Sequence, residues 1–109
     1  MKHTQLGEFE ELVLLVIGFL KDDAYSISIR NELKERTGRN PSIGALHSAF
    51  NRLEQKGFVE SKEGGATKER GGRRKRFYTM TTYGQQAVDQ SFELRNSLYQ
   101  ALPHVKLAK

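Results

Sequence analysis

Cysteine and tryptophan are absent from this chain of 109 residues, and proline occurs only twice. Without cysteine, neither a disulfide framework nor a thiolate metal site can form, which permits a reducing compartment. The longest apolar run, residues 12–17, is far too short to span a membrane. Acidic residues precede that run, which is not the pattern of a secretion signal. We therefore expect a cytoplasmic protein with one domain and one modest core.

Residues that would support catalysis are also scarce. The three histidines, His3, His47 and His104, are scattered along the chain and have no partner at i, i+4 spacing. No glycine-rich phosphate loop that ends in lysine and a hydroxyl residue occurs. We expect no enzymatic activity, no metal and no cofactor.

Positive charge, by contrast, is concentrated in one short segment. Residues 68–76 (Lys-Glu-Arg-Gly-Gly-Arg-Arg-Lys-Arg) carry six basic side chains and one acid, so their net charge of +5 equals that of the whole protein. A polyanion is the natural partner, because each basic group that neutralises a phosphate releases counterions. The simpler interpretation is a solvated loop. The residues predicted to contact the DNA backbone or minor groove are Arg70, Arg73, Arg74, Lys75 and Arg76.

Hydrophobic spacing and capping residues predict four helices and one β-hairpin. The helices are expected at residues 6–20, 25–37, 41–56 and from the cap Thr81 to about residue 102, and the strands at 58–62 and 76–80. This order predicts a mainly α fold with a two-stranded β-hairpin, which is a winged helix-turn-helix. We divide the chain into a DNA-binding domain (residues 1–80), a C-terminal dimerisation helix packed on the first helix (81–103) and a frayed tail (104–109).

The third predicted helix has one apolar face and one polar face. Leu46, Ala49, Phe50 and Leu53 form the core side at helical spacing. The opposite side is an ordinary solvated face or, next to a turn and a basic hairpin, a face that reads DNA bases in the major groove. His47 lies at the boundary, so it is either a phosphate or base contact on DNA or a partly buried, hydrogen-bonded histidine. The predicted contacts are Ser42, Gly44, His47, Ser48, Asn51 and Arg52.

The first and last helices have more apolar surface than a single small domain needs. The first is apolar around more than one face, whereas a surface helix needs a single stripe. The surplus is either core or the interface of a homodimer, in which two-fold symmetry would space two reading helices about 34 Å apart. The predicted interface residues are Leu12, Leu15, Phe19, Val88, Phe92, Leu94, Leu98, Tyr99 and Leu102.

Two stretches resemble the PadR-type transcriptional regulators. Residues 42–59 resemble that family's recognition helix, and residues 72–84 resemble its wing, in which a basic run leads into an aromatic strand and a Thr-x-x-Gly helix start. The similarity spans about residues 6–102 and implies a homodimeric repressor whose last helix pairs the subunits. This chain departs from the family at Ala24, Ala45 and His47-Ser48, and it has no tryptophan of the kind that holds planar drugs in some relatives.

The function expected from these features is sequence-specific binding of double-stranded DNA by a transcriptional regulator. Release from DNA would require a small-molecule inducer or a partner that moves the two reading helices. The alternative is a winged-helix module whose basic wing docks an acidic protein partner instead of DNA.

Overall fold

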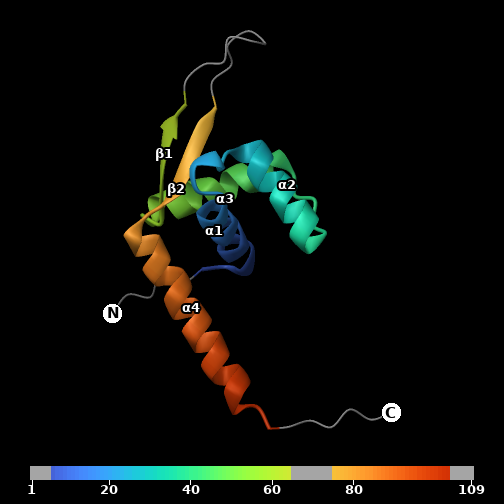
Figure 1. The fold of residues 1–109 in the computed structure, drawn as a ribbon, viewed down its shortest axis with the longest axis vertical. Coiled ribbons are helices and arrows are strands. Elements are labelled where there is room, and N and C mark those ends of the chain that lie inside the picture. Colours follow the sequence, from blue (N-terminus) through green and yellow to red (C-terminus); the bar gives the residue numbers. More distant parts are fainter. Residues whose placement is uncertain (1–5, 65–74, 104–109) are drawn as a thin grey trace.

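The computed structural model describes residues 6–64 and 75–103. Its elements are α1 (Glu8–Leu20), the 3₁₀ turn η1 (Lys21–Asp23), α2 (Ser26–Thr37), α3 (Ile43–Gln55), β1 (Val59–Glu63), β2 (Arg76–Met80) and α4 (Thr82–Ala101). The structure confirms the predicted mainly α fold with a two-stranded antiparallel hairpin and a C-terminal helix (Figure 1). The predicted tail, residues 104–109, lies outside the described residues.

Helix boundaries fall where the sequence supplies capping groups. The Ser42 hydroxyl accepts a hydrogen bond from the Ala45 amide at 3.0 Å, so α3 begins two residues later than predicted. The predicted cap Thr81 is confirmed, because its hydroxyl oxygen accepts from the Gly84 amide at 2.9 Å. Gly38 ends α2 at φ 76°, a left-handed conformation that favours glycine.

The core forms where α2, α3 and the hairpin surround α1 (Figure 1). Phe50 and Phe58 are its largest fully buried side chains. Each element contributes the face that its hydrophobic spacing assigns to the interior. The buried apolar residues are Val13, Leu14, Val16, Ile17, Ala24, Ile29, Leu33, Leu46, Ala49, Phe50, Leu53, Phe58, Val59, Tyr78, Ala87 and Val88.

The hairpin is attached to the helical body along β2. Its register runs from Val59 opposite Met80 to Glu63 opposite Arg76. The Tyr78 ring lies 4.4 Å from that of Phe50 between centroids, and the Tyr78 amide donates to the Ala24 carbonyl at 2.8 Å. These contacts fix the base of the wing relative to α2 and α3.

The start of α4 is hydrogen-bonded to Gly57 and Phe58, which lie between α3 and β1. We call this contact the joint. The Thr81 amide donates to the Phe58 carbonyl at 3.0 Å, and the Thr81 hydroxyl donates to the Gly57 carbonyl at 2.7 Å. A Cβ at Gly84 would lie only 2.2 Å from the Phe58 carbonyl oxygen, so the helix approaches the body closely there.

Beyond this joint, α4 extends away from the body (Figure 1). Its buried residues are Gly84, Ala87 and Val88, all in the first two turns. No helix within residues 6–64 and 75–103 is long and apolar enough to cross a membrane.

Candidate nucleic-acid interface

α3 is held by one face and presents the other to solvent. Its buried residues are Leu46, Ala49, Phe50 and Leu53, which confirms the predicted core side. The opposite face is polar and exposed, so it is available to a partner. All six predicted reading residues are exposed: Ser42, Gly44, His47, Ser48, Asn51 and Arg52.

His47 lies beside the core and not within it. Its ring meets the Phe50 ring edge-on, with centroids 5.5 Å apart and planes at 83°, while the residue as a whole is exposed. The exposure favours the surface interpretation over a partly buried histidine. Contact between His47 and DNA stays a prediction.

Arg52 has a partner inside the protein. Its Nε donates to Glu10 Oε2 at 2.5 Å, and Lys56 Nζ donates to Glu10 Oε1 at 2.8 Å. Burial acts to raise the pKa of the Glu10 carboxyl, but the hydrogen bonds from Lys56 and Arg52 outweigh it and lower the pKa below the ordinary 4.5. The bond uses one of the five guanidinium donors of Arg52, and its side chain is 54% exposed, so it can still reach a phosphate or base.

The described part of the wing contains two of the predicted basic contacts. Arg76 Nη1 donates to Ser61 Oγ at 2.8 Å, and that hydroxyl donates to Glu54 Oε2 at 2.7 Å, which connects β2 through β1 to α3. Lys75 Nζ lies 4.2 Å from the centroid of the Tyr25 ring, a cation–π contact. The other three, Arg70, Arg73 and Arg74, lie outside the described residues.

Sequence reasoning missed Tyr25 and Glu10. Tyr25 falls within the predicted helix 25–37, but in the structure it precedes α2 and its ring contacts Lys75. These residues lie 50 positions apart, and no local pattern signals such a contact. Glu10 did carry a signal, because it shares the i, i+3, i+4, i+7 face with Val13, Leu14 and Ile17. An acid on a core face needs a cationic partner.

The predicted dimer residues fall into two groups. Val88 is 5% exposed and belongs to the core of the single chain, and Leu12 is half-buried against that core. A groove of about 270 Å³ opens between α1 and α2, with Leu12, Leu15 and Phe19 in its lining. The exposed members are Leu15, Phe19, Phe92, Leu94, Leu98, Tyr99 and Leu102.

An exposed polar helix after a short turn, followed by a hairpin with a basic base, defines a winged helix-turn-helix protein. Comparison with known families matches residues 13–90 to the transcriptional regulator PadR-like family. The chain therefore belongs to the PadR-like family and is a DNA-binding transcriptional regulator, not an enzyme. A search of curated proteins found no match.

Solved structures agree with this assignment. A PadR family transcription regulator from Clostridium difficile superposes with a TM-score of 0.71 at 20% identity, covering 86% of this chain and 93% of that one. RosR of Halobacterium salinarum gives a TM-score of 0.70 at 26% identity, covering 94% of this chain and 84% of that one. A PadR-like transcription factor from Bacteroides fragilis gives 0.71 at 20% identity, with 84% of each chain covered. The two matches at 20% identity establish the fold alone.

Proposed function

We propose that this PadR-like regulator is a homodimeric repressor that binds a specific operator. α3 reads bases in the major groove through Asn51 and the residues around it, and the wing contacts the DNA backbone. Repression follows because the occupied operator excludes polymerase.

The observation that carries this proposal is the exposed face of α3. Gly44 and Ser48 are small and exposed, so the helix can approach base edges closely at its N-terminal end. Asn51 lies on the same face one turn further on, and an asparagine side chain can pair bidentately with adenine. Lys75, held over the Tyr25 ring, and Arg76, linked through Ser61 to α3, add positive charge at the base of the wing.

The exposed apolar residues of α4 support the dimer. Phe92, Leu98 and Tyr99 are each more than 60% exposed, although a soluble protein seldom presents so many large apolar side chains together. An isologous interface would bury this surface together with the α1–α2 groove. It would place two α3 helices about 34 Å apart and select a pseudo-palindromic operator.

Control of the repressor would come from a ligand or protein partner. Such an inducer can shift the equilibrium only if it binds better to an arrangement in which the two α3 helices no longer fit the operator.

The test is fluorescence anisotropy of the protein on DNA from upstream of its own gene and on scrambled DNA, over a salt series. We expect a preference of about a thousandfold or more and a steep salt dependence. Asn51→Ala should lower operator affinity about 10- to 100-fold without changing binding to scrambled DNA, whereas Gln86→Ala, an exposed amide on α4, should change neither.

Equal and weak binding to both DNAs would refute sequence-specific repression. Light scattering on the same sample should give twice the mass of one chain, and the mass of a single chain would refute the dimer.

A further inference from the structure

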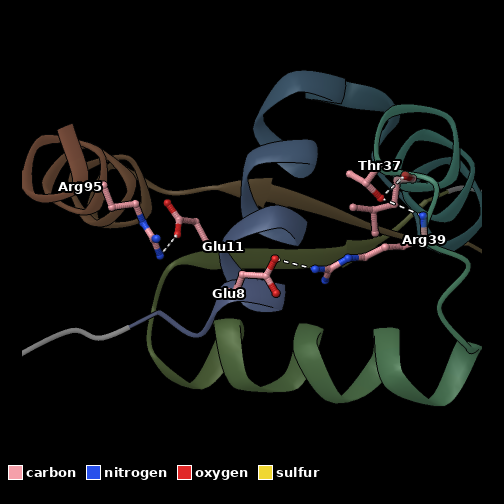
Figure 2. Close-up of polar contacts among 6 residues, drawn as sticks. Glu8, Glu11, Thr37, Arg39 and Arg95 are labelled. Atoms are coloured by element: carbon pink, nitrogen blue, oxygen red, sulfur yellow. Dashed lines mark hydrogen bonds and ion pairs between the residues drawn. The ribbon is translucent and has the colours of Figure 1, made fainter. Parts of the chain in front are cut away.

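The first turn of α1 carries three acids, and each is bound by a different part of the fold. Glu8 Oε2 accepts from Arg39 Nη2 in the α2–α3 turn at 2.6 Å. Glu10 accepts from Arg52 of α3 and from Lys56, the residue that follows this helix, as described above. Glu11 accepts from α4, with Arg95 Nη2 at 3.0 Å from Oε1 and Ser91 Oγ at 3.1 Å from Oε2. In Figure 2, Glu8 and Glu11 point in different directions, one toward Arg39 and the other toward Arg95.

The contact of Glu11 with α4 lies beyond the buried start of that helix. Val88 is the last buried residue of α4, and Ser91 and Arg95 follow it by one and two turns. Glu11 therefore holds α4 at the point where its packing on the body has ended.

Exposed ion pairs contribute little to stability, but the geometry here differs from that of an ordinary surface pair. The side chains of Glu10 and Glu11 are only 10% and 14% exposed. Each accepts hydrogen bonds from two donors, which fixes the carboxylate in orientation as well as in position. Because the two acids are consecutive in one helical turn, α3 and α4 are attached to the same rigid segment.

We propose that Glu11 is a positioning residue that sets the angle of α4 to the body and, together with Glu10, ties that angle to α3. The consequence for DNA rests on the function proposed above. If α4 pairs two subunits, its angle determines the separation of the two α3 helices and hence the operator half-site spacing that the dimer prefers.

The first experiment measures the angle without DNA. The chain has no cysteine, so Asn31→Cys on α2 and Gln100→Cys on α4 give two unique sites for spin labels. Pulsed electron–electron double resonance reports the distance between the two labels. The labelled chain is diluted with unlabelled chain so that the distance is measured within one chain. Glu11→Gln and Arg95→Ala should broaden or shift that distribution, whereas Glu93→Gln, which removes an exposed acid of α4, should leave it unchanged.

Exchanging the charges of Glu11 and Arg95 distinguishes a positioning role of this pair from a general loss of folding. Combining Glu11→Arg with Arg95→Glu should restore most of the narrow distribution that either single change loses. Circular dichroism should show unchanged helix content in every variant. An unchanged distance distribution in folded Glu11→Gln overturns the proposal.

The second experiment varies the half-site spacing of the operator one base pair at a time. The natural chain should prefer one spacing by about tenfold or more, and Glu11→Gln should reduce that preference to about threefold or less. A preference retained in full by Glu11→Gln would overturn the link to DNA. Failure of all chains to bind DNA would instead refute the repressor, while the distance measurement would still decide the role of Glu11.

Discussion

Two phenylalanines on helices of this protein occupy opposite environments. Phe50 of α3 is fully buried, whereas Phe92 of α4 is 64% exposed. The same contrast separates the body, formed by α1–α3 and the hairpin, from α4 beyond Val88. The body buries one continuous hydrophobic core within one chain, although Leu15 and Phe19 of α1 stay exposed. The far part of α4 is a regular helix whose large apolar side chains are exposed, as the proposed dimer contact requires.

The largest expected effect comes from truncating each phenylalanine. Phe50→Ala should lower the free energy of unfolding by about 3–5 kcal/mol, since it leaves a cavity in a fully packed core. Phe92→Ala should change the unfolding of dilute monomer by less than about 0.5 kcal/mol, because it removes an exposed side chain. It should instead weaken self-association, measured by sedimentation. Equal destabilisation by the two changes in dilute protein would contradict the division of the molecule.

A pair of glycine substitutions tests the joint at which the two regions meet. At Gly84 an added Cβ meets the Phe58 carbonyl oxygen at 2.2 Å, and at Gly18 it meets the Met80 methyl carbon, the end of a flexible side chain. Gly84→Ala should therefore cost about 2–3 kcal/mol of unfolding free energy. Gly18→Ala should cost about 1 kcal/mol or less, since the methionine can move. Urea denaturation measures both, and a larger loss at Gly18 would be inconsistent with the packing described.

An effect smaller than those of Phe50→Ala and Gly84→Ala is expected at Glu10, the buried acid of the body. Because the folded-state pKa of Glu10 lies below its ordinary 4.5, its stabilisation is fully present above that pH and is lost as the pH falls through the lowered value. Glu10→Gln should cost about 1–2 kcal/mol at neutral pH, since Arg52 and Lys56 stay partly exposed.

The difference in unfolding free energy between the natural chain and Glu10→Gln should shrink as the pH falls below 4.5. The exposed Glu93→Gln on α4 serves as the comparison and should show no such trend. A difference that stays constant down to pH ~3 would show that the Glu10 charge is not what stabilises the body.

Local patterns predicted most of the fold. Ser42, Thr81 and Gly38 carry their capping role in their own chemistry, and the apolar spacing of α3 identified its buried face correctly. Such features depend on residues within four positions of one another, so they are readable from sequence.

Long-range contacts escaped prediction because their partners are far apart in the chain. Glu10 meets Arg52 across 42 positions and Glu11 meets Arg95 across 84. Acids are common at the start of a helix because of the helix dipole, which explains the residue type at Glu10 and Glu11 but not their partners. Val88 shows a different difficulty. Its apolar stripe predicted a place in the dimer interface, but the residue is buried in the core of the single chain, and the sequence pattern does not distinguish these two environments.

The joint between β2 and α4 has a further consequence for how the chain can vary. A single residue, Thr81, separates the end of β2 from the start of α4. Inserting one residue there would rotate α4 by about 100° and advance it by about 1.5 Å. The exposed side chains of Phe92 and Leu98 would then point in a new direction relative to the wing. The covalent length of this connection therefore sets the rotational phase of the apolar face, and an insertion or deletion at this point would also move Ala87, Val88 and Ser91 out of their contacts with the body.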